Sequence, residues 1–156
     1  MLRISLIVVG DKMPEWVTRG YQEYEKRIHG RTRLNLVEIP AGKRSKNADI
    51  PRIIHAEEQK IRDAIPHQTQ VIALDRMGKT WSTVELSKRM QRWIDSGDQV
   101  ALVVGGPEGL SNEFIRSANE TWSLSSLTFA HPLVRVLLAE QLYRCHSILE
   151  GSPYHR

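Results

Sequence analysis

The chain alternates between short, uninterrupted apolar runs and longer segments in which apolar residues recur every three or four positions. The short runs are typical of strands that are buried on both faces of a sheet. The longer segments are typical of helices that cover such a sheet with one apolar stripe. Because the two kinds alternate along the chain, the pattern predicts an α/β fold with a parallel-rich sheet and helices on both faces.

Local start and stop signals support several of these boundaries. Asp49 can cap a helix that carries Pro51 in its first turn, Ser82 and Glu85 have the spacing of a capping box, and Gly151 follows the last helix. No repeat or linker interrupts the pattern, so we expect one domain over residues 1–156. The predicted strands are Leu2–Val9, Leu34–Ile39, Gln70–Leu74, Gln99–Val104 and Trp122–Phe129; the predicted helices are Pro14–His29, Ile50–Ile65, a helix that Ser82 opens, Ser111–Asn119 and Pro132–Leu149; Ala41–Asp49 and Arg76–Trp81 are predicted loops.

Composition narrows the class of protein. Hydrophobic residues make up 40% of the 156 positions and charged residues 26%, which is typical of a soluble globular protein. No apolar run approaches the roughly 20 residues that a membrane span needs, and Ile4–Val9 is too short for a signal core. We therefore expect a cytoplasmic protein. The single cysteine, Cys145, excludes an intrachain disulfide and a cysteine metal cluster, and we expect it in the core.

The positive charge is uneven along the chain. Residues 1–62 carry 13 Lys and Arg against 8 Asp and Glu, whereas residues 63–156 carry 9 against 10. A basic first part suggests a polyanionic partner, although an ordinary basic cytosolic protein fits equally well. Lys43, Arg44 and Lys46 form the densest cation cluster and are candidate phosphate ligands; a solvated loop is the alternative.

The last predicted helix is apolar around most of its circumference, although a helix that only covers a sheet needs one apolar stripe. A second buried face against another copy of the chain explains this pattern, and we favour it. The alternative is a helix that lies deep in its own core.

Two segments at strand ends are candidates for a small-molecule site. Gly105–Gly109 follows a buried strand, and glycines let the backbone approach a ligand closely, although a tight turn is the simpler interpretation. The turn has neither the Walker sequence nor G-x-G-x-x-G, which disfavours phosphate and dinucleotide binding. In Leu124–Phe129, hydroxyls could bind an adenine edge while Leu127 and Phe129 cover its face; an edge strand with a polar outer side is the alternative.

Titratable and aromatic groups gather at both ends of the last helix. The C-terminal Tyr154, His155 and Arg156 offer a stacking ring, an imidazole and a guanidinium, although chain ends often fray. His131 precedes the helix, and a His-Pro junction there is as consistent with a structural role as with a catalytic one.

Four segments together resemble one known family. IPAGKRSKNADI, LVVGGPEGLS, WSLSSLTFAHPLVRVLLAEQLYR and PYHR resemble the bacterial SPOUT-class methyltransferases that act on N3 of a pseudouridine in the 23S RNA of the large ribosomal subunit. The resemblance covers essentially the whole chain. It implies a C-terminal trefoil knot, S-adenosylmethionine as the methyl donor, no metal, and a homodimer whose substrate site lies across the subunit interface.

The resemblance implies the positions that hold the cofactor, and the chemistry of this reaction suggests roles for further residues as hypotheses. His155, Arg156 and Arg135 would donate hydrogen bonds to the target base or bind nearby phosphates, Tyr154 would pack on the base or the cofactor, and His131 is a lesser candidate. Lys43, Arg44 and Lys46 would contact RNA. The cofactor would lie against Leu74, Gly105, Leu124, Ser125, Ser126, Leu127, Thr128 and Phe129.

The small chain has no appended RNA-binding domain, so we do not expect it to read a naked RNA sequence with high specificity. The resemblance to the family implies that the substrate is rRNA within the assembled 70S ribosome. A non-catalytic RNA- or ribosome-binding factor remains an alternative, and an enzyme that uses ATP or NAD is a second one.

Overall fold

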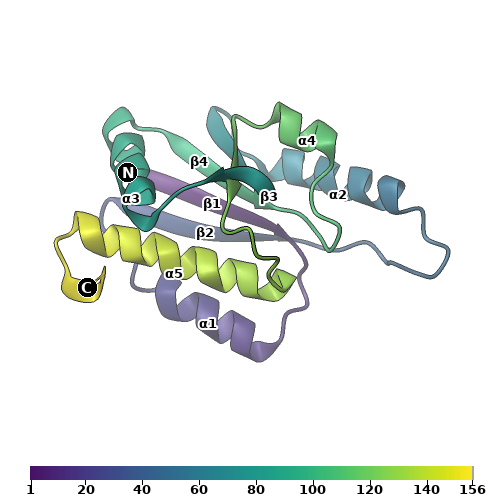
Figure 1. Ribbon diagram of the computed structural model, residues 1–156, viewed down its shortest axis with the longest axis horizontal. Coiled ribbons are helices and arrows are strands. Elements are labelled where there is room, and N and C mark those ends of the chain that lie inside the picture. Colours follow the sequence, from purple (N-terminus) through teal and green to yellow (C-terminus); the bar gives the residue numbers. More distant parts are fainter. Residues whose placement is uncertain (156) are drawn as a thin grey trace.

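The computed structural model describes residues 1–155 and contains one sheet of five parallel strands in the order β2-β1-β4-β3-β5 (Figure 1). This confirms the predicted α/β fold. The elements are β1 (Leu2–Val9), α1 (Glu15–Glu25), β2 (Thr32–Ile39), α2 (Ile50–Ala64), β3 (Thr69–Thr80), α3 (Thr83–Ser96), β4 (Gln99–Val104), α4 (Asn112–Ser117), β5 (Glu120–Ser123), α5 (His131–Leu149) and the short 3-10 helix η1 (Pro153–His155).

Helices cover both faces of the sheet, as the alternation predicts. Along β1, Leu6 and Val8 point to one face and Ile7 and Val9 to the other, because successive side chains of a strand alternate. Buried side chains of α1, α3 and α5 pack on the first face, and those of α2 and α4 pack on the second. The strands are therefore apolar on both sides, which explains their uninterrupted apolar runs.

The predicted helix signals operate as the sequence suggests. The Asp49 carboxylate accepts a hydrogen bond from the Arg52 amide at 3.2 Å and caps α2. The Ser82 hydroxyl accepts from the Glu85 amide, and the Glu85 carboxylate accepts from the Ser82 amide, which completes the capping box of α3. These ends are fixed by groups within one turn of each other, so sequence alone could locate them.

Three predicted boundaries are wrong. The first helix ends at Glu25 rather than His29, because the chain turns through Gly30 at φ +72° to enter β2. Strand β3 continues to Thr80 through the predicted loop, because its pairing with β5 resumes at Lys79 after a register shift. The fifth strand ends at Ser123, and the predicted strand residues beyond it form no ladder.

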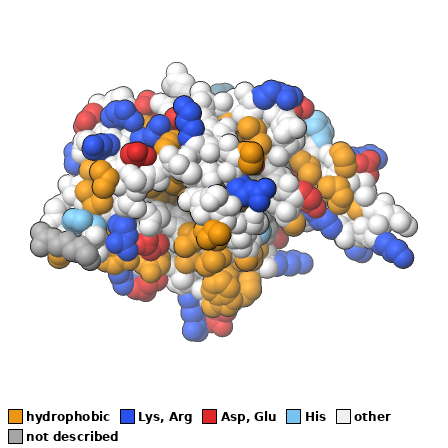
Figure 2. All heavy atoms as spheres, viewed as in Figure 1, with side chains coloured by type: hydrophobic (Ala, Val, Ile, Leu, Met, Phe, Trp, Pro, Cys, Tyr) orange, Lys and Arg blue, Asp and Glu red, His pale blue; other side chains and the backbone are white. Residues whose placement is uncertain are grey.

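Helix α5 packs against α1 and α3 but leaves part of its apolar surface in solvent. Leu133, Val136 and Leu137 are only partly buried, and Trp16 at the start of α1 is 57% exposed. Figure 2 shows hydrophobic side chains gathered over the first turns of these two helices. We call Trp16, Leu133, Val136 and Leu137 the α1–α5 apolar face.

Within residues 1–155, no helix combines the length and the apolar character that crossing a bilayer requires.

Candidate functional site

A cavity of about 550 Å³ opens at the carboxyl end of β4, beside Leu74, Asp75 and Arg76 in the middle of β3. In parallel sheets this edge is the usual place for a ligand, and the volume lies in the range of small-molecule sites. Two chain segments form its walls: the glycine wall, Gly105–Gly109, and the serine wall, Leu124–Phe129. The lining residues are Leu74, Asp75, Arg76, Val104, the whole glycine wall, Trp122, Leu124, Ser125, Leu127, Thr128, Phe129, His131 and Val134.

The glycine wall is a closed turn and also lines the cavity. The Gly109 amide donates to the Gly106 carbonyl at 2.9 Å, and Gly109 has φ +81°. A Cβ on Gly105 would lie 2.7 Å from the carbonyl carbon of Gly109, which no side chain tolerates. The two interpretations of this motif, tight turn and binding site, therefore hold together.

The serine wall is an irregular loop rather than the predicted strand. Two serine hydroxyls bond to its backbone: Oγ of Ser123, the last residue of β5, donates to the Ser125 carbonyl at 2.9 Å, and Ser125 Oγ accepts from the Leu127 amide at 3.0 Å. Such local bonds compete with a ladder, which explains why β5 stops. The wall's link to another element is a bond of 3.0 Å from Arg76 to Thr128 Oγ1.

Most of the predicted cofactor residues meet in this cavity. Leu74, Gly105 and every predicted residue of the serine wall except Ser126 line it; Ser126 is not among the described lining residues. Leu127 lines the cavity although it is 68% exposed, so an apolar side chain stands at the rim without protein cover.

Sequence reasoning missed five lining residues outside the two walls: Asp75, Arg76, Val104, Trp122 and Val134. Val104 directly precedes Gly105, which was predicted. Asp75 and Arg76 directly follow Leu74 at the end of the apolar run of β3, and this position is a signal that could have found them. Trp122 and Val134 carry no such signal. The Trp122 ring stacks on Trp81 with centroids 4.7 Å apart, and its buried Nε1 has no partner among the described residues.

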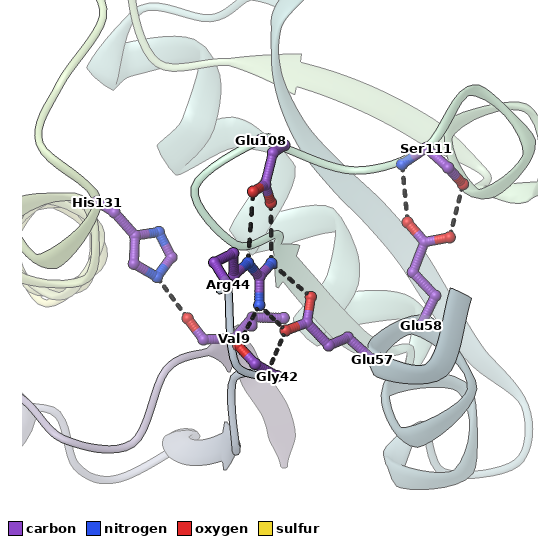
Figure 3. Close-up of polar contacts among 8 residues, drawn as sticks. All are labelled: Val9, Gly42, Arg44, Glu57, Glu58, Glu108, Ser111 and His131. Atoms are coloured by element: carbon purple, nitrogen blue, oxygen red, sulfur yellow. Dashed lines mark hydrogen bonds and ion pairs between the residues drawn. The ribbon is translucent and has the colours of Figure 1, made fainter. Parts of the chain in front are cut away.

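His131 lies at the first turn of α5 and lines the cavity. Its Nε2 bonds to the Val9 carbonyl oxygen, which can only accept, so this bond assigns the proton to Nε2 (Figure 3). Burial lowers the pKa of His131 below its ordinary value, and Arg135 and Arg44 add to the decrease. The ring is therefore neutral at pH 7 and keeps a lone pair on Nδ1.

Arg135 lies one turn further along α5 and is not among the described residues that line the cavity. It is 3% exposed, it donates to Glu38 at 2.7 Å, and it donates to the Gly10 carbonyl at 3.0 Å. These bonds join α5 to the ends of β1 and β2. Its predicted role toward the target base stays a prediction.

The C-terminal residues lie at the other end of α5. The Tyr154 ring packs on Tyr143 with centroids 4.6 Å apart, and the Arg144 guanidinium lies 4.8 Å from its centre. His155 is exposed, and Arg156 lies outside the described residues. The 19 residues of α5 span about 28 Å, so Tyr154 and His155 are remote from the cavity of their own chain.

The three predicted RNA-contacting cations differ in their surroundings. Lys43 and Lys46 are exposed. Arg44 instead lies between the carboxylates of Glu57 and Glu108, and it points toward the glycine wall (Figure 3). These bonds to Glu57 and Glu108 raise the pKa of the Arg44 guanidinium, which stays charged at any ordinary pH.

Neither a reactive thiol nor a cluster of metal ligands is found at the site in the described residues. Cys145 is fully buried, and burial raises the pKa of its thiol to about 12, so it is not a nucleophile at neutral pH. Over residues 1–155, no three His, Cys, Asp or Glu side chains are placed to hold a metal ion together.

Comparison with known proteins gives consistent matches. Residues 2–155 match a family model described as "Predicted SPOUT methyltransferase". The chain is 54% identical over 155 residues to the ribosomal RNA large subunit methyltransferase H of Thioalkalivibrio sulfidiphilus and of Hahella chejuensis, and each alignment covers 99% of both chains. Among solved structures, it is similar to a probable methyltransferase from Bordetella pertussis, with a TM-score of 0.59 and 18% identity over 92% of this chain and 95% of that one.

Proposed function

The chain belongs to the SPOUT methyltransferase family, and from this premise we propose that it methylates N3 of a pseudouridine in the 23S RNA of the large ribosomal subunit. It is an enzyme whose methyl donor is S-adenosylmethionine. The observation that carries the choice of RNA is the 54% identity, over almost the whole length, to two proteins named as large-subunit rRNA methyltransferases.

The cavity has the features that this methyl donor requires. The glycine wall presents backbone without Cβ atoms, and the serine wall presents hydroxyls next to the apolar side chains of Leu127 and Phe129. An adenine ring combines polar edges with apolar faces, so such mixed walls suit it. When bound, S-adenosylmethionine supplies an electrophilic methyl group on a sulfonium.

The protein's own task is to position the base, exclude water and manage one proton. The target nitrogen lies between two carbonyl groups, and donors placed at those oxygens would stabilise the negative charge that develops when its proton leaves. We propose His155 and Arg156 as donors and Tyr154 as a packing surface. His131 is a second candidate, since its neutral ring faces the cavity with Nδ1 unprotonated.

This assignment requires two copies of the chain, and we propose a homodimer. Tyr154 and His155 are separated from the cavity of their own chain by the length of α5, so they can act only in the cavity of a partner. The α1–α5 apolar face supports the same proposal, because an exposed apolar patch on a water-soluble domain marks an interaction surface.

Mixing two inactive variants tests the shared site. His155→Ala removes the tail donor, and a cavity variant such as Gly105→Ala removes the cofactor site. Homodimers of each would be inactive. If the tail serves the partner's cavity, random reassociation restores one complete site in each heterodimer, and activity returns to about a quarter of the wild-type value. Zero recovery, with heterodimers present by native mass spectrometry, would contradict a shared site.

We propose that the substrate is the assembled 70S ribosome, which would also place the enzyme in the cytoplasm. The basic cluster is small, and the described chain carries no separate RNA-binding unit that could read an RNA sequence by itself. Purified enzyme should methylate 70S particles far faster than protein-free 23S rRNA, with the product located by mass spectrometry of RNA fragments. Equal rates on both substrates would refute this part of the proposal.

A further inference from the structure

Two consecutive carboxylates of α2, Glu57 and Glu58, are buried behind the glycine wall. They are 4% and 6% exposed, and they lie on the sheet face opposite α5. Burying one carboxylate is costly unless it is fully bonded, and burying two neighbours is more so. Each is bonded, and the two hold different residues of the segment that contains the wall: Glu108 within it and Ser111 just after it.

Glu57 holds Glu108 of the glycine wall through Arg44. The Glu57 Oε2 accepts a hydrogen bond from the Gly42 amide at 2.7 Å. The two carboxylate oxygens of Glu57 also accept from Nη1 and Nη2 of Arg44, and the Nη2 bond is 2.9 Å long. The same guanidinium donates to Glu108 of the glycine wall, at 2.9 Å from Nη2 and 3.3 Å from Nε. Arg44 is therefore a bridge of fixed planar geometry between α2 and the wall (Figure 3).

Glu58 directly holds Ser111, two residues after the wall. Its oxygens accept from the amide and the hydroxyl of Ser111, at 2.7 and 2.6 Å. The Ser111 hydroxyl also accepts from the Phe114 amide at 3.1 Å and so caps α4. The residue at which the chain leaves the glycine wall is thus fixed to α2 and α4 together.

The wall rests on the guanidinium itself. A Cβ added to Gly106 would lie 2.8 Å from Arg44 Nη2 and 3.3 Å from a methyl group of Val9. Nothing larger than glycine fits between the cavity and Arg44 without displacing one of them. A change in the position of Arg44 therefore changes the position of the cavity wall.

We propose that Glu57 and Glu58, acting through Arg44 and Ser111, set the shape of the glycine wall and thereby the affinity of the cavity for S-adenosylmethionine. Arg44 is a positioning residue in this role, distinct from the exposed Lys43 and Lys46. To bind an RNA phosphate instead, it would have to leave two carboxylates, one of them buried and then unpaired. The proposal rests on the family's use of this methyl donor.

Calorimetric titration of the purified protein with S-adenosylmethionine, without RNA, tests the proposal. Arg44→Met should raise the Kd at least about tenfold, since small misplacements of binding groups have effects of this size. Arg44→Lys keeps the positive charge but lacks the planar guanidinium, so its Kd should lie between those of the wild type and Arg44→Met. Lys60→Met removes an exposed cation from α2, the helix that carries Glu57 and Glu58, and is the matched control, with unchanged affinity.

The variants Glu108→Gln and Ser111→Ala keep the Arg44–Glu57 pair. They test the same proposal if Arg44→Met does not fold. Each variant should raise the Kd for S-adenosylmethionine. The double variant Arg44→Lys with Glu108→Gln should raise the Kd by less than the product of the two single increases, because both substitutions act on the same bond. The hydrogen bond from Arg44 lowers the pKa of Glu108, so wild-type affinity should fall as the pH drops below the ordinary carboxyl pKa. Glu108→Gln should remove that acid dependence.

The outcomes separate the two levels of inference. No binding by the wild-type protein would refute S-adenosylmethionine as the methyl donor. Wild-type binding with wild-type affinity in folded Arg44→Met, or in folded Glu108→Gln and Ser111→Ala, would refute the positioning role alone. A selective rise in the KM for ribosomes, with unchanged affinity for S-adenosylmethionine, would return Arg44 to the RNA-contacting group.

Discussion

The two walls of the cavity are built in opposite ways. The glycine wall is bonded to α2 and α4 through Glu108 and through Ser111, which follows it. The serine wall is bonded chiefly within itself, and Leu127 at its rim is 68% exposed. One side of the site is thus anchored to the body of the protein, whereas the other is held by short-range bonds that leave its position less constrained.

This difference suggests how the site works. A wall fixed by buried ion pairs has its binding shape before the ligand arrives, which lowers the cost of ordering on binding. A wall held by its own hydroxyls can close over a ligand and cover apolar side chains that are exposed without it. We infer that the glycine wall provides pre-organised contacts and that the serine wall adapts to the ligand.

The strongest test of the anchoring of the glycine wall is the variant Gly105→Ala. Its Cβ would meet backbone atoms of Gly109 and Leu110 at 2.7 and 2.8 Å, and backbone cannot move away cheaply. We expect the affinity for S-adenosylmethionine to fall by about 100-fold, with a loss of stability of about 1–3 kcal/mol. Calorimetry and thermal unfolding measure the two effects. A fully active, stable variant would show that the anchored wall is less rigid than its contacts indicate.

A double variant, Lys43→Met with Lys46→Met, tests the exposed cations next to the anchored wall. Loss of two phosphate contacts should raise the KM for ribosomes several-fold. The slope of log affinity against log salt concentration should become shallower by about 2. The affinity for S-adenosylmethionine should stay at the wild-type value, unlike in Arg44→Met. A change in cofactor affinity instead would mean that these lysines also support the wall.

The variant Ser125→Ala tests whether the local bonds of the serine wall contribute to ligand binding. The variant removes the acceptor of the Leu127 amide, a bond whose loss costs about 1 kcal/mol. We expect a roughly fivefold higher Kd for S-adenosylmethionine. Ser126→Ala is the matched neighbour, and its effect should be smaller. Hydrogen exchange adds a direct comparison, since ligand binding should protect residues 124–129 more than residues 105–109. Equal protection would remove the distinction between the walls.

The smallest expected effect is on the pH dependence of stability, through His131. Because burial lowers its pKa in the folded state, the unfolded chain binds a proton more readily, and stability falls as the pH drops below the ordinary value of 6.5 and through the folded pKa. Denaturant unfolding of the wild type and of His131→Gln between pH 7.5 and pH 5, a range chosen around an ordinary histidine pKa of about 6.5, should give a smaller pH dependence for the variant. Identical dependence would exclude a buried neutral ring.

Local signals made much of the fold predictable. The uninterrupted run of β1 and the capping box at Ser82 each act within a few residues, and the structure confirms both. Most of the resemblance-derived cofactor residues line one cavity, because Gly105 follows β4, Leu74 lies in the neighbouring parallel strand β3, and the serine wall follows β5, which pairs with β3 at Leu74.

Predictions failed where distant groups decide the structure. Strand β3 continues beyond Leu74 because β5 pairs with Lys79 and Thr80, a partner that the local pattern does not reveal. The trefoil knot stays a prediction, since the order of strand pairing does not by itself determine threading.

By itself, the sequence determined the α/β class, the capped helix starts and the segments that meet at the carboxyl edge of the sheet, because these depend on periodicity and on contacts between near neighbours. Only the tertiary structure decided that Arg44 faces Glu57 and Glu108 rather than solvent. It also decided that the tail lies at the far end of α5 from its own cavity. Both facts depend on groups 13 to 64 residues apart in the chain, or on the length of a helix, and a buried charge takes the partner that folding brings to it.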